Sequence, residues 1–332
     1  MRAQKITGEE LPMRSLVLAL FLLSAGWSPL GAQEWPSRTV TIIVPFIAGS
    51  TPDSLARILA EGLQQRLGVA FVVENRAGAS GNTGTAAVAK AVPDGHTLGV
   101  SIAGPLVINA LLFPKMPYET EKDIAPISIL ASQPSVLVLS PGVAADGVES
   151  LLAAIKSAPD KYTYGSIGRG SLSHLAMASL ALKAGVNLVH LPFPGSPAVV
   201  TALLRGDVQM AVMPAGSVAP LAAEGKLRLL AVTSPQRSPL LPALPTLREA
   251  GVAGIQADAW VGLIAPAGTS ESVLAKIHQQ IVLVLGSEPV VERLKGQLMV
   301  PIASSPAAFK AVLREEHDRW APIIAAGGIK AE

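Results

Sequence analysis

The chain has 332 residues, of which 50% are hydrophobic and 15% are charged, and its formal net charge at pH 7 is +2. This length exceeds what one hydrophobic core usually organises, and the apolar content excludes a disordered protein, so two globular lobes are expected. Charge runs are short and mixed in sign, which argues against a nucleic-acid partner, and the lack of cysteine excludes disulfides, thiolate metal sites and a lipidated N-terminal cysteine.

The first segment has the features of an export leader. Arg14 is followed by an apolar run, residues 16–23, and then by small residues up to Ala32. The run is far shorter than the ~20 residues that a bilayer-spanning helix needs, so a signal peptide is favoured over a membrane anchor. Residues 1–32 are therefore predicted to be a signal peptide, which implies a periplasmic mature protein.

After the leader, short β-branched runs alternate with longer stretches of helical period. This alternation predicts an α/β fold in which each lobe is a mainly parallel sheet flanked by helices. The predicted strands are 40–44, 70–73, 97–101, 127–130, 136–139, 162–165, 188–191, 208–212, 227–232 and 261–265. The predicted helices are 53–66, 83–91, 106–112, 148–157, 171–184, 198–204, 218–224, 270–285, 289–296 and 306–323.

Two connecting segments, 124–134 and 251–266, are suited to crossing between lobes. A chain that crosses twice builds one lobe from both of its ends. Residues 35–130 and 256–332 are therefore predicted to form lobe 1, and residues 131–255 to form lobe 2, with hinged closure between them.

The most informative segment is residues 44–53, VPFIAGSTPD, in which a strand ends, a glycine loop follows and a helix begins. Thr51 can cap this helix, with Pro52 at the first helical position. The free amides of the first turn, together with the helix dipole, attract anions. Asp53 leaves two interpretations open, because its carboxylate could receive an ammonium or hydroxyl group of a ligand or could complement the dipole.

A second glycine loop, residues 164–174, also precedes a predicted helix. Its glycines do not fit the GxGxxG pattern, so a dinucleotide site is weakly supported. Ser171 is the predicted cap, and the amides of residues 168–171 could bind one end of a carboxylate. Residues 193–196 open a third helix and could line the same cleft.

A long glycine loop, residues 74–84, precedes the second predicted helix and could also line the cleft. For Glu74, Asn75 and Arg76 we favour a local hydrogen-bonded corner that holds this loop over a direct ligand role.

Catalytic arrangements are scarce. The five histidines are scattered without metal-ligand spacing, and neither GxSxG nor HExxH occurs. Only His174 lies near a predicted site, and because no orienting acid is evident, a histidine hydrogen-bonded within its loop is favoured over a Ser–His pair. We expect no enzyme activity, no cofactor and no metal.

Several motifs occur in order along the chain. They are WPSRTV from residue 35, VPFxAG from residue 44, VENRxGAxGNxG from residue 73, PDGxTL from residue 93, AVTS from residue 231 and APAG from residue 265. With them the chain, from about Trp35 to its end, resembles the Bug family, the TctC-like receptors of tripartite tricarboxylate transporters.

This resemblance implies a monomeric, two-lobed periplasmic binding protein of the type II, Venus-flytrap class. Such proteins hold the carboxylate of an organic or amino acid with loop amides and ordered water, and they deliver it to integral-membrane permease subunits. An alternative is a ligand sensor whose closed form docks on a membrane histidine kinase. A hydrolase acting in the cleft is a third, less favoured possibility.

The resemblance and the glycine loops together give the predicted ligand-binding residues. Those of the first loop are Phe46, Ala48, Gly49, Ser50, Thr51 and Asp53, and those of the second are Ser166, Gly168, Gly170, Ser171 and His174. Ser101, Ile102, Ala103, Phe193, Pro194, Gly195, Ser196 and Met213 complete the set.

The chain departs from the family pattern on one side of this site. Where relatives often have PYKG it has PFPG, residues 192–195, and so lacks a phenol and a cation. We therefore expect Phe46, Phe193, Met213 and Ile102 to cover a less polar ligand tail. Burying an unpaired polar end there would cost roughly 1–3 kcal/mol, which would disfavour a dicarboxylate such as aspartate.

Overall fold

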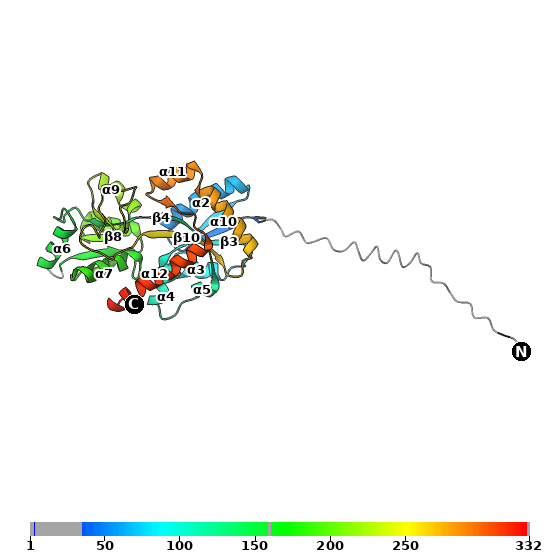
Figure 1. The fold of residues 1–332 in the computed structure, drawn as a ribbon, viewed down its shortest axis with the longest axis horizontal. Coiled ribbons are helices and arrows are strands. Elements are labelled where there is room, and N and C mark those ends of the chain that lie inside the picture. The colour runs from blue at the N-terminus through cyan, green and yellow to red at the C-terminus, as the bar shows by residue number, and fades with distance from the viewer. Residues whose placement is uncertain (1–2, 4–34, 159–160, 331–332) are drawn as a thin grey trace.

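The computed structural model describes residues 3, 35–158 and 161–330. The predicted signal peptide, residues 1–32, lies outside these described residues apart from Ala3. The described chain forms two β-sheets, each accompanied by helices, which lie side by side along the long axis of the molecule (Figure 1). The predicted two-lobed α/β architecture is confirmed.

The first sheet has six strands in the order β11-β4-β10-β3-β1-β2. These strands are β1 (Val40–Val44), β2 (Phe71–Asn75), β3 (Thr97–Ile102), β4 (Ile124–Gln133), β10 (Ala259–Pro266) and β11 (Val300–Pro301). The helices of this part of the chain are α2 (Thr51–Leu67), α3 (Asn82–Ala89), α4 (Asn109–Leu112), α5 (Thr120–Asp123), α10 (Glu271–Leu285), α11 (Glu288–Gly296) and α12 (Pro306–Ala326), with the short turns η1 (Ala79–Gly81) and η2 (Gly104–Ile108).

The second sheet has five strands in the order β7-β6-β8-β5-β9. These strands are β5 (Ser135–Leu139), β6 (Thr163–Ser166), β7 (Val189–Pro192), β8 (Met210–Pro214) and β9 (Arg228–Val232). Its helices are α6 (Val148–Ser157), α7 (Leu172–Ala184), α8 (Ser196–Arg205) and α9 (Ala219–Ala223), with the turn η3 (Ala215–Ser217).

The prediction that the sheets are mainly parallel is wrong, because both sheets are mixed. β1 is parallel to β2 and β3, but β10 runs antiparallel to β3 and β4. In the second sheet β6 is parallel to β7 and β8, whereas β5 is antiparallel to β8 and β9. β4, β5 and β10 are buried along almost their whole length, so they have the continuous apolar character of parallel strands, and this pattern carries no information on strand direction.

The chain passes between the sheets twice. β4 leads through Pro134 into β5, and the chain returns from β9 to β10. The first sheet therefore takes strands from both ends of the sequence. The lobe limits of 130/131 and 255/256 stay a prediction.

Every predicted strand overlaps one of β1–β10, and every predicted helix overlaps a helix of the structure. The segment 106–112 is divided between the π-helical turn η2 and α4. The two-residue β11 and the four-residue α5 were not predicted, because elements this short do not establish a periodic pattern.

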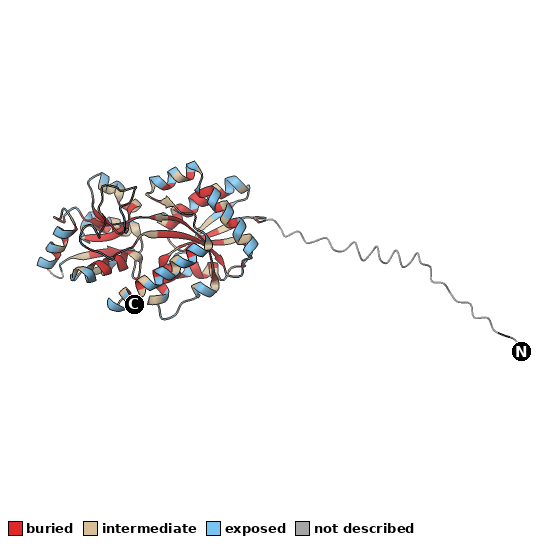
Figure 2. Ribbon diagram, viewed as in Figure 1, coloured by how far each residue is buried: buried red, intermediate tan, exposed pale blue. Residues whose placement is uncertain are grey.

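The apolar stripe of the first helix shows how local sequence leads to packing. On α2, Leu55, Leu59 and Leu63 are fully buried, while Arg57 and Glu61 are exposed on the other side. Figure 2 shows the same division of buried and exposed faces along the helices. Burying one such leucine contributes about 1.5–3 kcal/mol, so this face fixes the helix, and with it the loop before the helix, on the sheet.

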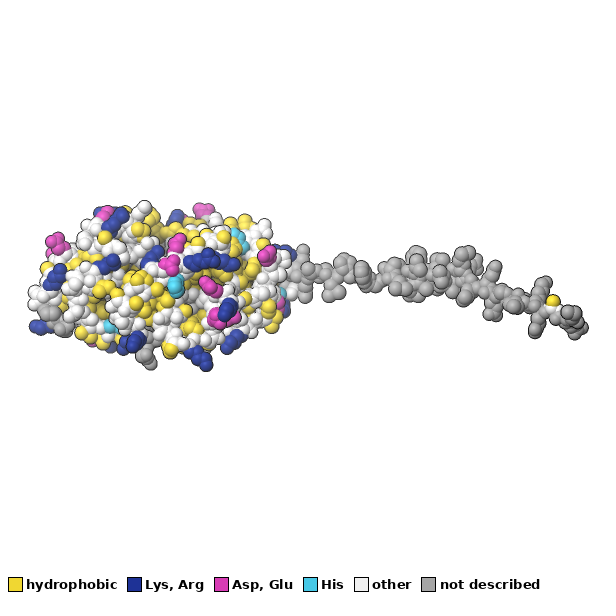
Figure 3. Space-filling model, turned by 60° about the horizontal axis from the view of Figure 1, so that its bottom comes forward, with side chains coloured by type: hydrophobic (Ala, Val, Ile, Leu, Met, Phe, Trp, Pro, Cys, Tyr) yellow, Lys and Arg dark blue, Asp and Glu magenta, His cyan; other side chains and the backbone are white. Residues whose placement is uncertain are grey.

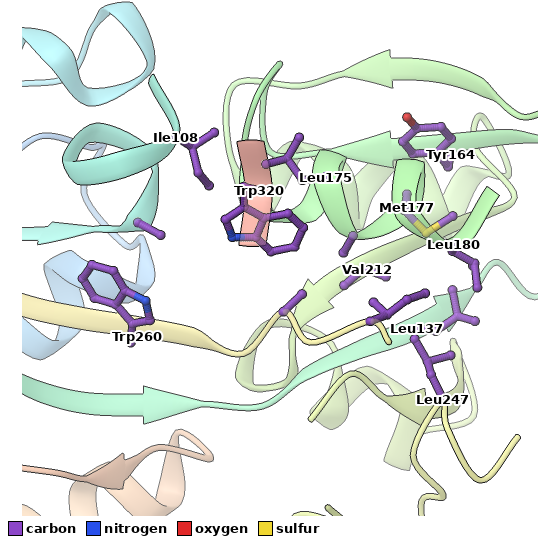
Figure 4. Close-up of a cluster of buried hydrophobic side chains, with 14 of the residues drawn as sticks. Ile108, Leu137, Tyr164, Leu175, Met177, Leu180, Val212, Leu247, Trp260 and Trp320 are labelled. Atoms are coloured by element: carbon purple, nitrogen blue, oxygen red, sulfur yellow. The ribbon is translucent and has the colours of Figure 1, made fainter. Parts of the chain in front are cut away.

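A buried cluster joins the two parts of the molecule. Trp320 of α12 lies between Ile108 of η2 and Leu175 of α7 (Figure 4), and all three are fully buried. The C-terminal helix therefore packs on elements that accompany both sheets. On the face shown in Figure 3, basic and acidic side chains are interspersed, in line with the small net charge.

Candidate functional site

A cleft lies between the sheets, lined by residues that follow β1, β3, β6 and β7 and by the ends of β8 and β10. Its empty space is about 1040 Å³, including the open mouth. The predicted residues that line it are Phe46, Ser50, Thr51, Ile102, Ala103, Gly168, Ser171, Pro194, Gly195 and Ser196. The glycine loops named from the sequence are thus brought together, and their contact with a ligand stays a prediction.

Three helices begin at this cleft. Their N-cap residues are Ser50 for α2, Ser171 for α7 and Gly195 for α8. Ser171 caps as predicted, accepting a hydrogen bond from the amide of His174 at 3.2 Å. The cap of α2 lies one residue earlier than predicted, at Ser50, and neither Ser50 nor Gly195 supplies a side-chain cap. The first turns of α2 and α8 therefore keep donors for an anion.

Asp53 anchors the first loop. It is 3% exposed, does not line the cleft, and accepts hydrogen bonds from the amide of Gly49 at 2.8 Å and from Asn75 Nδ2 at 2.9 Å. Arg57 Nη2 pairs with it at 2.9 Å. Burial opposes ionisation, but the hydrogen bonds from Arg57, Gly49 and Asn75 outweigh it and hold the pKa of Asp53 below its usual value. With its oxygens engaged by the protein, Asp53 has the structural role.

The Glu74–Arg76 corner is confirmed. Arg76 forms a bidentate pair with Glu74, at 2.7 and 3.0 Å. Asn75 lies between them and turns toward the first loop, where its Nδ2 donates to the carbonyl oxygen of Phe46 at 3.0 Å. The corner thereby holds Phe46 at the cleft wall.

A stack of three aromatic rings, from Tyr164, His190 and His174, packs next to the second glycine loop. His174 lies on His190 with ring centroids 3.8 Å apart, and Tyr164 stacks on His190 at 4.8 Å. The amide of Gly170 donates to His174 Nδ1 at 3.0 Å, as expected for a histidine bonded within its loop.

A Ser–His contact also occurs here, between Ser166 Oγ and His190 Nε2 at 2.7 Å. Ser166 donates its own proton to the carbonyl of Gly168 at 3.0 Å. Burial, followed by the charge of Arg169, lowers the pKa of His190 to about 4, which makes it a weak base. Because the hydroxyl proton is directed to Gly168 and His190 is a weak base, Ser166 is not activated as a nucleophile, and the contact orders the loop.

The histidine stack predicts a pH dependence of stability. Burial, then the charges of His190 and Arg169, lower the pKa of His174 to about 3. The unfolded chain, with a histidine pKa of about 6.5, binds more protons, so stability is complete above that pH and falls as pH decreases toward 3. Between pH 7.5 and 5, His174 should account for a loss of about 2 kcal/mol.

Urea unfolding of the wild type and of His174→Gln at both pH values tests this. The variant should lose less stability on acidification, and the comparison cancels the opposing contribution of Asp258, whose pKa burial raises to about 6. An identical loss in both proteins would contradict the assignment.

Nine predicted residues do not line the cleft. They are Ala48, Gly49, Asp53, Ser101, Ser166, Gly170, His174, Phe193 and Met213. Met213, expected to cover a ligand tail, is fully buried in the core with Val136 and Val199. Its neighbours Val212 and Pro214 line the cleft instead, because successive residues of a strand point to opposite faces.

Sequence reasoning missed several lining residues. Among them are Asn109, Ser135, Arg169, Ser173 and Trp260, whereas Ser80 belongs to the loop 74–84 that was expected to line the cleft. Trp260 lies on the predicted second crossing, and Arg169 and Ser173 lie inside the second glycine loop and helix start, so their positions were available from the sequence although their orientation was not.

Three residues that line the cleft have a buried polar side-chain atom without a hydrogen-bond partner in the protein. Ser50 Oγ, Ser173 Oγ and Trp260 Nε1 make no hydrogen bond to any described residue. Ser50 directly precedes α2, Ser173 lies on α7 and Trp260 lies on β10, so the three atoms come from different parts of the chain. Each unsatisfied buried donor costs about 1–3 kcal/mol, so a ligand that accepts hydrogen bonds would relieve this cost.

The residues described offer no metal site and no membrane span. Within 35–158 and 161–330, no group of three or more His, Asp or Glu side chains could hold a metal ion. No described helix combines the length and hydropathy needed to cross a bilayer.

Comparison with known proteins gives concordant matches. The family model described as "TctC: Tripartite tricarboxylate transporter family receptor" matches residues 55–329. The chain is 34% identical to protein BugT of Bordetella pertussis over 316 residues, 95% of this chain and 97% of that protein.

Solved structures of similar fold and sequence also match this chain. R. palustris Rpa4515 with adipate has a TM-score of 0.85 and 32% identity, covering 90% of this chain and 99% of that one. MatC from Rhodopseudomonas palustris with bound malate has a TM-score of 0.81 and 31% identity, covering 87% of this chain and 100% of that one.

Proposed function

Because the chain belongs to the tripartite tricarboxylate transporter receptor family, we propose that it is a periplasmic solute-binding protein that closes its two lobes around a small organic carboxylate. Its family is one of receptors that bind solutes. The bound acid is then released to integral-membrane permease subunits.

The observation that carries this proposal is the set of buried donors without partners. Two hydroxyl groups and one indole N–H, from Ser50, Ser173 and Trp260, are enclosed at the cleft and unsatisfied. The uncapped first turns of α2 and α8 add main-chain donors beside them. A carboxylate accepts several hydrogen bonds at once, so it satisfies this arrangement better than a neutral solute would.

The rest of the cleft suits an aliphatic body. Phe46, Ile102, Val212 and Pro214 line it with apolar surface. The ligands of the two similar structures, adipate and malate, are small aliphatic acids. A ligand of this class, with its charged end at the buried donors, fits both kinds of wall.

Delivery to a permease and presentation to a sensor kinase both use the closed form, since either partner recognises lobes held together by ligand. We favour the permease because the matching family is one of transporter receptors. The predicted leader, residues 1–32, supports export. Genes for membrane subunits beside this one would favour the permease, and a gene for a histidine kinase would favour the sensor.

Calorimetry with a panel of aliphatic, aromatic and dicarboxylic acids tests the proposal. One matched pair of variants isolates the donors, because Ser173 and Ser179 lie on the same helix and both have a buried, unpartnered hydroxyl, but only Ser173 lines the cleft. Ser173→Ala should weaken carboxylate binding about tenfold, whereas Ser179→Ala should leave it unchanged. Absence of binding by every acid, or equal effects of the two variants, would contradict the proposal.

A further inference from the structure

Resting on the proposed function, we propose that Arg169 pairs with a second acidic group of the ligand, so that this receptor selects an aliphatic dicarboxylate over a monocarboxylate of the same length. Arg169 is the one charged side chain among the described residues that line the cleft. No acidic residue accompanies it there. The cleft thus carries a positive charge that the protein itself does not neutralise.

Other arginines near the loops are neutralised by protein carboxylates. Arg57 pairs with Asp53 and Arg76 pairs with Glu74. Arg169 is exposed, and within the described ranges it forms no such ion pair. A guanidinium presents a planar fork of donors that matches a carboxylate in a bidentate geometry, so an anionic ligand group is its natural partner at this position.

The backbone on both sides of Arg169 is held in place. Gly168 and Gly170 have φ values of +125° and +69°, which give the loop its sharp turn. Gly168 bonds to the side chain of Ser166, and Gly170 donates to His174. The main chain is therefore ordered before a ligand arrives, and less entropy is lost when the side chain engages one.

One carboxylate does not need Arg169. The neutral donors Ser50, Ser173 and Trp260, with the first-turn amides, already provide hydrogen bonds for one charged end. A monoacid that uses them leaves the guanidinium without a counterion. A diacid long enough to reach from the donors to Arg169 satisfies both.

This changes the expectation drawn from the sequence. The apolar residues that stand where relatives have PYKG predict a cleft that disfavours dicarboxylates, whereas Arg169 adds a positive charge to the same lining. With Arg169 on the wall, the cost of burying a second acidic group is offset by a charged partner.

Calorimetry with pairs of acids of equal length tests the proposal: succinate with butanoate, adipate with hexanoate, and suberate with octanoate. In the wild type, the best diacid should bind about tenfold or more tightly than its monoacid partner. Arg169→Met should reduce this ratio to about threefold or less, and Arg169→Lys should give an intermediate ratio. Arg205→Met removes the same charge from the end of α8, outside the cleft lining, and should keep the wild-type ratio.

The outcomes separate this inference from the proposed function. If monoacids and diacids bind the wild type equally, or if Arg169→Met keeps the preference, the role of Arg169 is refuted while carboxylate binding stands. If no carboxylate binds at all, the proposed function fails and this inference fails with it.

Discussion

Replacing Asp53 by alanine is expected to lower the free energy of unfolding by about 3 kcal/mol and to weaken carboxylate binding. The carboxylate is buried and accepts hydrogen bonds from Gly49, Asn75 and Arg57. Its removal leaves the amide of Gly49 without its acceptor and Asn75 with only the carbonyl of Phe46, so the first loop loses its attachment to α2 and is held less firmly on β2. Urea unfolding and calorimetry measure the two effects.

Glu61→Ala is the matched control on the same helix. Glu61 also pairs with an arginine, Arg293, but both side chains are about half exposed, at 53% and 48%. Exposed ion pairs contribute about 0–1 kcal/mol, so this variant should unfold almost as the wild type does. Equal losses in the two variants would show that Asp53 has no special role.

Gly170→Ala should weaken ligand binding about tenfold or more. Gly170 has a φ of +69°, and a Cβ there would overlap the side chain of Leu112 on α4. Because Leu112 belongs to the part of the chain that precedes β4 and Gly170 to the loop after β6, the Leu112 side chain would have to move, and the packing between the two sides of the cleft would change. The measurement is calorimetry with whichever acid binds the wild type.

Gly185→Ala separates backbone strain from this collision. Gly185 has a similar φ of +62°, but a Cβ there would meet nothing within 4 Å. Both variants should lose about 1 kcal/mol of stability from the left-handed backbone, and only Gly170→Ala should lose affinity. Adding Leu112→Ala to Gly170→Ala should restore part of the binding, and a lack of any rescue would count against the collision.

Much of the fold follows from local sequence. The strand β1 and the helix α6 have the predicted bounds, because β-branched runs and helical periodicity are properties of neighbouring residues. Strand direction is a property of the whole topology. β10 is apolar along its length in either direction, so its antiparallel pairing with β3 and β4 could not be inferred from its residues.

The sequence predicted which main-chain segments form the site, but not how the side chains around it are oriented. Glycine and cap residues mark where helices begin, and these positions do meet at the cleft. The partners of Asp53 were partly available, since Arg57 follows it at the i+4 spacing that joins side chains on a helix. The orientation of Trp260 and Arg169 depends on how distant segments pack, which no local pattern encodes.

The position of β10 has a consequence for the order in which the protein acquires its shape. β10 lies between β3 and β4, and it is the tenth strand along the chain. When the chain emerges N-terminus first, the edges of β3 and β4 that face β10 have no partner strand until residues 259–266 have emerged. The five-stranded sheet takes consecutive strands, β5 to β9, so it can assemble before β10 emerges. The six-stranded sheet contains the first strands to emerge but is the last to be completed.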